Sequence, residues 1–440
     1  MFQKTKKTFL GYGYRLGDPG KVRKINLRDS DRKGHLFCFG STRIGKTRLI
    51  ELMMEQDIRK GYSVAFFDPK GEIDIFSKIV QVAYEEDRQD DLCLVTPIFP
   101  HCSARMDPLS YYYMPEELVS HVVSGIKARE EFFINIAYET TFVIVQSLLF
   151  FAKIKKERPQ LNFNAVKERA SYMDLRNLEE QLRDYENDPE AEEILVSLRQ
   201  ILTSPQDYFG KVSSSLRTVL TSLSAWSVGA IIGKARANNF IKRLEQGQKV
   251  ILIFQTGSLL TRKTAHIVAR VLLSMIQSFV GRVYLSGKNV SPPLCIYMDE
   301  ASNLLYMGIE DLFNKSGGAG VWVHAFTQSI ADIEAEIGPA NARKILDNAN
   351  TKVFMRVNDP KTADYVADYS GMTRRFSPLL SLGGEITVRE VEEPNVRPED
   401  VLNLQLRDFF MFSFSGAFRG KAGYVEEPYV QIRYPKVEVL

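Results

Sequence analysis

Cysteine is scarce in this sequence, with four residues in 440, and none of them stands in a CxxC motif or a paired spacing. They are Cys38, Cys93, Cys102 and Cys295. Three lie inside apolar runs, as is typical of small core residues in a reducing compartment. His101 beside Cys102 has no second ligand pair nearby. The sequence therefore argues against both a disulfide framework and a structural zinc site.

An uninterrupted hydrophobic run of membrane-spanning length is also missing. The best candidate covers residues 132–152, but polar residues such as Asn135, Glu139 and Gln146 interrupt it. Its spacing favours a buried amphipathic helix over a transmembrane helix. Because no signal-peptide pattern is visible either, we expect the chain as given to be soluble.

The small formal net charge of +3 hides a basic amino-terminal segment. Residues 1–33 hold three Asp and ten Lys or Arg, a net charge of +7, which leaves about −4 for the rest of the chain. The basic residues are Lys4, Lys6, Lys7, Arg15, Lys21, Arg23, Lys24, Arg28, Arg32 and Lys33. Two interpretations stay open: a surface that meets anionic lipid or nucleic acid, and a solvated basic tail.

Short apolar runs alternate with helical patterns at the start of the chain. Residues 35–39, 63–68 and 91–97 have the pattern of strands, and helical segments separate them. From about 115 to 200 the pattern is helical and strand-poor. Strand-like runs then resume at 249–257, 293–301, 320–329, 351–357 and 408–416. This order predicts an α/β core, with a mostly parallel sheet flanked by helices and interrupted by an all-helical insertion.

A phosphate-binding loop lies between the first of these strands and the helix that follows it. The residues from Gly40 to Thr47, GSTRIGKT, match GxxxxGK[ST] in full. Backbone N–H groups of such a loop turn inward around phosphate oxygens at the positive end of a helix. Lys46 would neutralise the β- and γ-phosphates, and Thr47 would bind Mg²⁺. The expected nucleotide-binding residues are Gly40, Ser41, Thr42, Arg43, Ile44, Gly45, Lys46, Thr47 and Arg48.

This loop defines a predicted domain organisation. A basic segment covers residues 1–33, and the first part of the nucleotide-binding domain covers 34–113. The all-alpha inserted domain covers 114–225, and the second part of the nucleotide-binding domain, with C-terminal strands, covers 226–440.

A candidate hydrolytic pair closes the apolar run PLCIYM. Asp299 at the end of a buried strand can hold the water shell of Mg²⁺, and Glu300 can act as general base toward the attacking water. Asp68, which closes another apolar strand, competes for the Mg²⁺ role, but Pro69 follows it and it lacks a neighbouring Glu. Gln328 ends the strand after Asp299, where an amide could sense the γ-phosphate. The alternative for Gln328 is a surface residue, and His324 in that strand fits a core histidine.

These motifs, in this order, resemble the TraD/TraG class of type IV secretion coupling proteins. GSTRIGKT, FDPKGE, YMDEASNLL, AFTQS and NTKVFMRVNDPKTADYV carry the resemblance, with FLGYGYRLGD and NVRPEDVLNL near the two ends. The run NKSGGAGVWVHAFTQSIADIEAEIG is especially similar to TraD-type members of integrative conjugative elements. The resemblance covers about residues 9 to 425.

The resemblance implies a RecA/FtsK-like motor with an inserted all-alpha domain. It implies ATP and Mg²⁺ as cofactors, and homo-hexamers at the cytoplasmic face of the bacterial inner membrane, with a monomer left open for a soluble form. It implies ATP-driven delivery of relaxase-bound DNA to a secretion channel and its inner-membrane components. By position, Lys46 and Thr47 become the phosphate and Mg²⁺ contacts, Asp299 and Glu300 the hydrolytic pair, and Gln328 the sensor.

Two features depart from this class. Members usually carry transmembrane helices before the FLGYGYR-like stretch, which here follows eight residues, so we expect either a soluble form or one that needs a membrane partner. Many members also place a Gly-Arg pair before the Gln, to reach a neighbour's ATP. Here that position is Gly317-Gly318, and Arg343 and Arg356 are the candidate substitutes.

Residues that would contact DNA are weakly marked. The loop 284–293, the region of Lys263, and Lys211 with Arg217 are candidates, although each is more typical of a solvated charge. An alternative function is a receptor that recruits effector proteins to the channel with little DNA translocation. A P-loop kinase is a third interpretation, but we find neither an acceptor pocket nor an arginine-rich lid.

Overall fold

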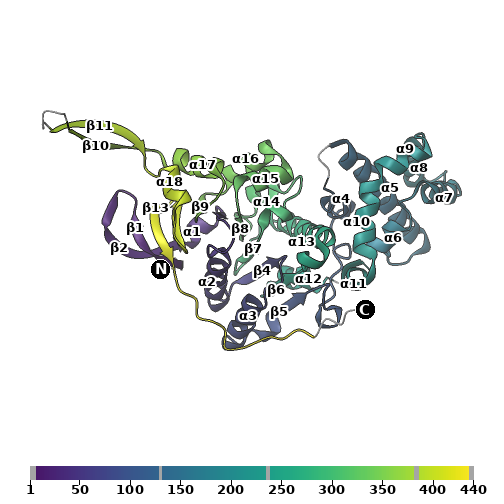
Figure 1. Cartoon of the computed structure of the whole chain (residues 1–440). Coiled ribbons are helices and arrows are strands. Elements are labelled where there is room, and N and C mark those ends of the chain that lie inside the picture. The colour runs from purple at the N-terminus through teal and green to yellow at the C-terminus, as the bar shows by residue number, and fades with distance from the viewer. Residues whose placement is uncertain (1–5, 128–130, 234–237, 381–385, 436–440) are drawn as a thin grey trace.

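A computed structural model of the chain shows a long twisted sheet covered by helices, with a bundle of helices at one end (Figure 1). The structure describes residues 6–127, 131–233, 238–380 and 386–435. Within these residues the main sheet has eleven strands, in the order β2-β1-β13-β12-β9-β3-β8-β7-β4-β6-β5. These strands are β1 (Lys7–Arg15), β2 (Asp18–Arg28), β3 (Leu36–Phe39), β4 (Ser63–Asp68), β5 (Leu92–Val95), β6 (Ile251–Gln255), β7 (Leu294–Met298), β8 (Val321–Thr327), β9 (Thr351–Phe354), β12 (Asp408–Ser413) and β13 (Gly416–Ala422).

The strands from β9 to β5 run parallel, and β12, β13, β1 and β2 extend the sheet with antiparallel pairs. Successive side chains of β3 point to opposite faces, as pleated strands require. Leu36 and Cys38 join one hydrophobic cluster, while Phe37 and Phe39 join another. A strand buried on both faces is apolar at every position, which explains why the apolar runs in the sequence predicted these strands correctly.

Helices from before and after the helical bundle in the sequence cover the two faces of the sheet (Figure 1). One hydrophobic cluster takes its helical residues from α2 and α3, and α13 to α17 contribute to the other. These helices are α1 (Asp29–Arg32), α2 (Lys46–Arg59), α3 (Ile73–Glu85), α13 (Ser258–Leu285), α14 (Glu310–Lys315), α15 (Ile330–Ile337), α16 (Pro339–Asn348), α17 (Pro360–Ser370) and α18 (Pro398–Leu402). The predicted α/β core with a mostly parallel sheet is confirmed.

The helical bundle lies between β5 and β6 in the sequence, as the strand-poor stretch predicted. Its helices are α4 (Pro115–Ser124), α5 (Glu131–Lys155), α6 (Phe163–Lys167), α7 (Tyr172–Arg183), α8 (Pro189–Leu202), α9 (Gln206–Val212), α10 (Ser214–Ser224), α11 (Trp226–Val228) and α12 (Asn239–Glu245). Side chains of Asn162, Ser171 and Asp188 cap α6, α7 and α8 by accepting hydrogen bonds from backbone N–H groups. Because α11 and α12 follow residue 225, the helical stretch extends past the expected boundary, and the domain division stays a prediction.

Two described helices are long and apolar enough to cross a membrane by length and composition. In α13, 67% of the most apolar window is buried inside the protein, and the helix packs against α4, α10 and α14. In α5 the buried share is 39%, with contacts to α4 and α8. The bent pair of α10 with residues 226–233 would make a third candidate. The helix at 132–152 is therefore present, but it is less buried than we expected.

The basic amino-terminal segment is part of the sheet, so its interpretation as a solvated tail is wrong for the described residues. β1 pairs with β13, and β2 pairs with β1. Leu10, Ile25 and Leu27 are buried beneath the hairpin, which gives the segment a hydrophobic face that its charge conceals. Lys4 lies outside the described residues.

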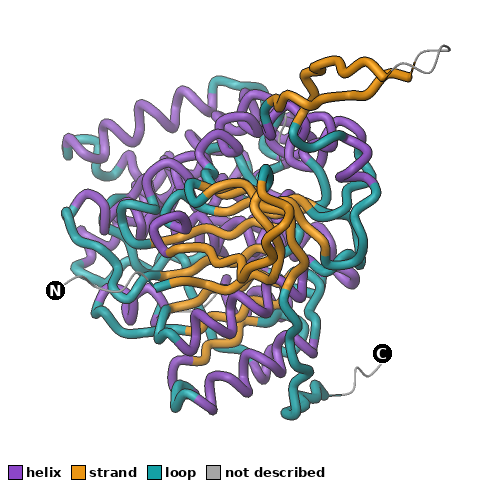
Figure 2. The backbone as a smooth tube through the Cα atoms, turned by 90° about the vertical axis from the view of Figure 1, so that its left-hand side faces the viewer, coloured by secondary structure: helices purple, strands orange, loops and turns teal. Residues whose placement is uncertain are grey.

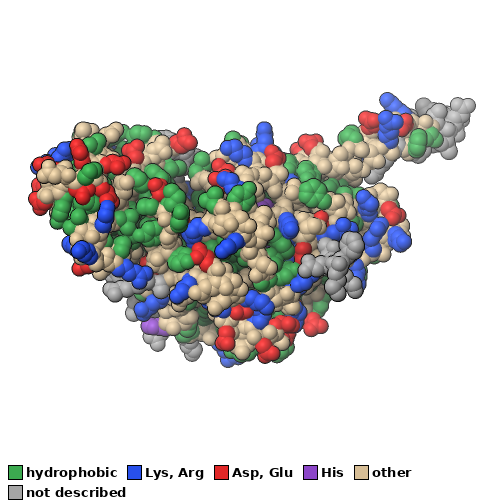
Figure 3. All heavy atoms as spheres, turned by 180° about the vertical axis from the view of Figure 1, so that it is seen from behind, with side chains coloured by type: hydrophobic (Ala, Val, Ile, Leu, Met, Phe, Trp, Pro, Cys, Tyr) green, Lys and Arg blue, Asp and Glu red, His purple; other side chains and the backbone are tan. Residues whose placement is uncertain are grey.

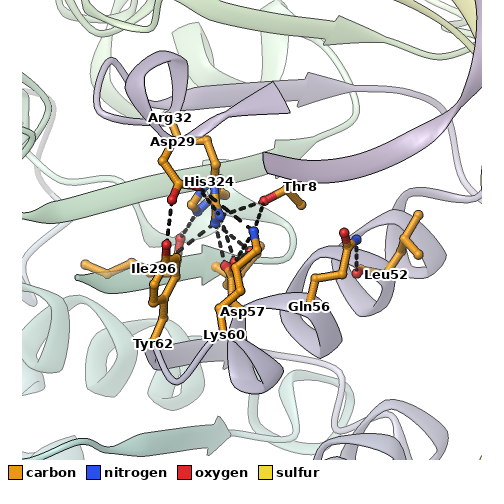
Figure 4. A network of polar contacts seen from close by, with 12 residues as sticks. Thr8, Asp29, Arg32, Leu52, Gln56, Asp57, Lys60, Tyr62, Ile296 and His324 are labelled. Carbon is orange, nitrogen blue, oxygen red and sulfur yellow. Dashed lines mark hydrogen bonds and ion pairs between the residues drawn. The ribbon is translucent and has the colours of Figure 1, made fainter. Parts of the chain in front are cut away.

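Arg32, one of the ten basic residues of that segment, is completely buried in a polar network (Figure 4). Its guanidinium binds Asp57 of α2 and donates hydrogen bonds to Thr8 of β1 and Tyr297 of β7. Its Nε donates to Nε2 of His324 at 3.1 Å, so the other ring nitrogen carries the proton that is shared with the Ile296 carbonyl. His324 is thus a satisfied core histidine, as predicted.

Two segments extend from this core. Within the described residues, β10 (Met372–Leu380) and β11 (Ile386–Pro394) form a separate two-stranded sheet that projects from the body (Figure 2). Residues after β13 run along α3, where the backbone N–H of Tyr429 donates to Gln81 and that of Ile432 donates to Ser77. On the face shown in Figure 3, basic and acidic side chains are interspersed.

Candidate nucleotide site

The predicted phosphate loop connects β3 to the amino terminus of α2. Gly45 precedes the first helical residue and has a φ of 110°, in the region that favours glycine. The free N–H groups of the first turn of α2 thus open toward the loop, which is the standard arrangement for binding phosphate. Residues 40–48 therefore lie between a strand and a helix, where the sequence predicted the phosphate-binding loop.

Lys46 lies across the mouth of this loop. Its Nζ donates to the carbonyl oxygens of Gly40 at 2.6 Å and Ser41 at 2.8 Å. Burial lowers the pKa of Lys46, and the nearby Lys70 ammonium lowers it further, while neighbouring anionic groups oppose both effects. The ammonium is thus short of negative partners, and phosphate oxygens would supply them.

Asp299 and Glu300 follow β7, and β8 lies between β7 and the phosphate-loop strand β3. Since the carboxyl ends of parallel strands meet at one edge of a sheet, this order brings the pair to the loop. Glu300 has a φ of 48°, which is unusual for a residue with a side chain and concentrates at functional sites. The Glu300 side chain accepts a long hydrogen bond, 3.4 Å, from Asn303.

Lys70 lies within the FDPKGE motif and is a site residue that the sequence pattern did not predict. Its Nζ lies 2.9 Å from Asp299 Oδ2 and 3.6 Å from Glu300 Oε1, so it bridges the predicted hydrolytic pair. Burial alone would lower the pKa of Lys70, but the charges of Asp299 and Glu300 raise it overall. A charged ammonium therefore stands among the groups that would surround a terminal phosphate.

Asp68, the competing Mg²⁺ residue, is used by its own loop. Its Oδ1 accepts the N–H groups of Lys70 and Gly71, and its Oδ2 accepts that of Glu72 and the amide of Gln255. These four bonds hold the turn that carries Lys70. Asp68 has little acceptor capacity left for a metal, which favours Asp299.

Gln328 comes directly after β8 and is held by the helix that follows it. Ser329 caps α15 in a reciprocal capping box with Asp332, so Gln328 is fixed between a strand end and a helix start. A cavity of about 800 Å³ joins Gln328 to Lys46, Thr47, Lys70 and Glu300. Its other lining residues are Thr42, Arg43, Gly45, Arg48, Glu72, Ser258, Leu259, Arg262, His266, Ser302, Asn303, Thr327, Asp332, Leu406 and Arg407.

Two arginines in this lining were missed because no motif marks them. Arg407 precedes β12, donates its backbone N–H to the Ile44 carbonyl at 3.1 Å, and has a φ of 70°. Arg262 comes from the start of α13 and is exposed. Both reach the site through tertiary packing of segments far from the phosphate loop in sequence.

The expected position of a trans-acting arginine lies at the amino ends of the parallel strands, opposite the ends that carry the phosphate loop. Gly317 and Gly318 precede β8, and a Cβ at Gly317 would come 2.1 Å from the Lys33 carbonyl oxygen. Position 317 therefore cannot carry a side chain without moving the backbone. Arg343 and Arg356 are exposed and line no part of the described cavity, although the Arg356 carbonyl accepts the Ser41 N–H at 2.7 Å. The identity of that arginine stays a prediction.

The candidate DNA-contacting residues separate into different places. The loop 284–293 precedes β7, at the edge opposite the phosphate loop. Arg217 donates to the Gly210 carbonyl at 2.7 Å, and Lys211 near it is exposed. Lys263 lines a cavity of its own beside the nucleotide site.

The residues present fit a nucleotide-bound Mg²⁺. Among the described residues, no group of three or more His, Cys, Asp or Glu could hold a metal ion by itself. Mg²⁺ bound to a nucleotide needs only one or two protein groups beside phosphates and water. Thr47 on the cavity wall and Asp299, already beside a cation, are suitable donors.

Known proteins resemble this chain in sequence and in fold. Residues 293–381 match the family described as the TraM recognition site of TraD and TraG. A probable conjugal transfer protein TraG of Sinorhizobium fredii (strain NBRC 101917 / NGR234) is 26% identical over 174 residues. That alignment covers 38% of this chain and 27% of TraG, so the chain spans well under two thirds of that relative.

Solved structures of the conjugative coupling protein TrwB share the fold across nearly the whole chain. Unbound TrwBdeltaN70 has a TM-score of 0.70 at 15% identity, covering 96% of this chain and 90% of that one. TrwB in complex with ADP and Mg²⁺ has a TM-score of 0.66 at 15% identity, covering 97% and 96%. The family match and the similarity to TraG therefore support a coupling protein of the TraD/TraG class, and the TrwB structures share its fold.

Proposed function

We propose that this protein is an ATPase that couples relaxase-bound DNA to a type IV secretion channel. One observation carries the proposal: the strand order gathers Lys46, Thr47, Glu300 and Gln328 around one cavity, from three separate strand ends. That arrangement suits hydrolysis of a bound triphosphate. TrwB, whose fold the chain shares, binds ADP and Mg²⁺, which supports ATP as the nucleotide.

Each of these residues has a distinct role in the proposed hydrolysis of ATP. Glu300 accepts a proton from the attacking water while the oxygen of that water bonds to the γ-phosphorus. The bond between the γ-phosphorus and the oxygen bridging to the β-phosphate then breaks, which releases ADP. Lys46 and Lys70 stabilise negative charge on the transferring group. Mg²⁺, held through Thr47 and Asp299, would neutralise the phosphates. Gln328 orients the water or detects loss of the γ-phosphate.

The proposed substrate and assembly are the ones that the resemblance to the TraD/TraG class implies. Coupling by TraD/TraG-class proteins concerns conjugative transfer, and the names of TraG and TrwB point the same way. We infer a homo-hexamer at the inner membrane, in contact with channel components and with DNA carrying a relaxase. The match to a TraM recognition site supports a relaxosome partner.

The test is ATP hydrolysis with and without single-stranded DNA, using the wild-type chain and Lys46→Ala. We expect hydrolysis that rises with DNA, and loss of the basal and the stimulated rates in the variant. DNA-stimulated hydrolysis that survives Lys46→Ala would contradict the proposal. Hydrolysis without DNA binding, combined with binding of a secreted protein, would instead favour the effector-receptor function.

A further inference from the structure

We propose that a second, basic cavity beside the nucleotide site binds the phosphodiester backbone of a single nucleic acid strand. The cavity measures about 720 Å³, within the range of ligand-binding pockets. It lies where the helical bundle meets the sheet domain, and this binding deepens the proposed function by giving its DNA substrate a contact site.

Four parts of the chain build this junction cavity. The segment after α4 contributes Lys127, the start of α10 contributes Ser214 and Thr218, the first turns of α13 contribute Arg262 and Lys263, and α15 contributes Glu336. The other lining residues are Gly125, Ile126, Ser215, Val219, His266, Ile267 and Arg270. A ligand held here would therefore touch both the helical insertion and the ATPase core.

The charge of the junction cavity is strongly positive. Lys127 and Arg270 share one carboxylate, Glu336, at 2.6 Å and 3.0 Å. Arg262 and Lys263 are exposed and have no hydrogen-bonding or ion-pair partner among the described residues. The four cations thus face a single anion, and such an excess favours a polyanionic ligand.

His266 reports the same positive environment. Burial lowers the pKa of His266 to about 4, and the charges of Arg270, Arg262 and Lys127 contribute, with Glu336 opposing them. The hydroxyls of Ser214, Ser215 and Thr218 lie at the amino terminus of α10, where N–H groups and the helix dipole also favour phosphate oxygens. Proteins commonly bind a sugar-phosphate backbone with such a combination of hydroxyl and backbone N–H donors and Lys or Arg side chains.

The junction cavity and the nucleotide cavity share a wall. Arg262 and His266 line both. Arg270 donates from its Nε to the carbonyl of Asn303 at 3.1 Å, and Asn303 in turn contacts Glu300. The backbone N–H of Ser258, the first residue of α13, donates to the Pro69 carbonyl beside Lys70 at 2.6 Å. A nucleic acid strand bound at α13 would therefore contact a helix that is hydrogen-bonded to Asn303 and Pro69. Asn303 contacts Glu300, and Pro69 precedes Lys70.

The experiment measures binding of a fluorescent 20-nucleotide oligo-dT by anisotropy at several salt concentrations. Lys263→Ala removes a cation that lines the junction cavity and not the nucleotide cavity, and Lys361→Ala, at an exposed lysine of α17 that lines neither cavity, is the matched control. We expect Lys263→Ala to weaken binding and to reduce the slope of log Kd against log salt by about 0.7, the value for one lost phosphate contact on a single strand. Lys361→Ala should change neither quantity.

Equal affinities and slopes for Lys263→Ala and wild type would overturn the proposal, as would equal effects of the two variants. A competition arm distinguishes the source of the phosphate: unlabelled oligo-dT should displace the labelled strand, and displacement by ATP at equal phosphate concentration would assign the cavity to free nucleotides instead. Binding of a fluorescent ADP analogue, unchanged in Lys263→Ala, separates this result from the proposed ATPase. If wild type binds the strand but hydrolyses no ATP, the proposed function fails and the cavity assignment stands.

Discussion

Arg32 and Asp57 form a two-pronged ion pair in which both side chains are fully buried, with N–O distances of 2.7 Å and 2.5 Å. Arg32 follows the amino-terminal hairpin and Asp57 belongs to the helix that begins at the phosphate loop. The pair therefore ties the hairpin to the nucleotide-binding core. Burial would raise the pKa of Asp57, but the charge and hydrogen bonds of Arg32 hold it at about 2.

Replacing one partner of this pair should be strongly destabilising. Asp57→Asn removes the carboxylate that binds the buried Arg32 guanidinium in a bidentate pair and leaves only Asp29, 3.7 Å away, as a negative partner among the described residues. Breaking a buried ion pair in this way costs roughly 3–5 kcal/mol of unfolding free energy. Urea denaturation measures the change. Arg59→Ala, which removes an exposed arginine bound to Glu55, Glu85 and Glu86, is the control and should cost at most about 1 kcal/mol. Equal effects of the two variants would contradict the account.

The hairpin illustrates what the sequence could and could not predict. Strands that are buried at every position, such as β3 and β4, were predictable because burial of both faces makes them mostly apolar. The amino-terminal hairpin alternates basic residues with a few buried ones, and its sheet neighbour β13 lies near the other end of the chain. Nothing local in the sequence announces such a pairing, so the charge dominated the interpretation.

The site divides in the same way. The phosphate loop and the Asp299–Glu300 pair follow strands directly, so motif and strand position together located them. Lys70 and Arg407 enter the cavity because a capped turn and an antiparallel strand direct them there. Arg32 was counted as part of a surface charge, because the sequence cannot show that Asp57 and Thr8 surround it.

Lys70→Ala should impair hydrolysis more than binding. Its ammonium contacts both members of the hydrolytic pair, and removing one preorganised charge from an active site typically lowers kcat by about 100-fold. Lys70→Arg should recover part of that loss. Steady-state kinetics together with binding of a fluorescent ADP analogue separate the two effects. An unchanged kcat in Lys70→Ala would show that the lysine has no part in the reaction.

Asp299→Asn and Asp68→Asn should differ in their dependence on Mg²⁺. Asp299 accepts a hydrogen bond from Lys70, which lines the cavity, whereas the Asp68 carboxylate already accepts four hydrogen bonds, three of them within its own turn. We expect Asp299→Asn to raise the Mg²⁺ concentration needed for nucleotide binding, and Asp68→Asn to lower thermal stability with little change in that concentration. The reverse pattern would restore Asp68 as the metal residue.

Stability should fall as the pH drops from 6 to 5. Burial lowers the pKa of His35 to about 4, that of His121 to about 3 and that of His324 well below its usual value. The unfolded chain takes up protons on these histidines below pH 6.5, whereas the folded chain does not until the pH nears their lowered pKa values. The contribution of these three histidines to the free energy of unfolding should therefore decrease by roughly 3–4 kcal/mol over that interval. Urea titrations at the two pH values with superimposable curves would contradict this.

The most direct test of the central claim compares wild type with Glu300→Gln in one assay of ATP binding and hydrolysis. Glu300 lines the cavity, where its side chain contacts Lys70 and Asn303, and Gln keeps its size while removing the base. We expect the variant to bind ATP with the wild-type Kd and to hydrolyse it at least about 100-fold more slowly. Hydrolysis at the wild-type rate in Glu300→Gln would show that this cavity is not the hydrolytic site.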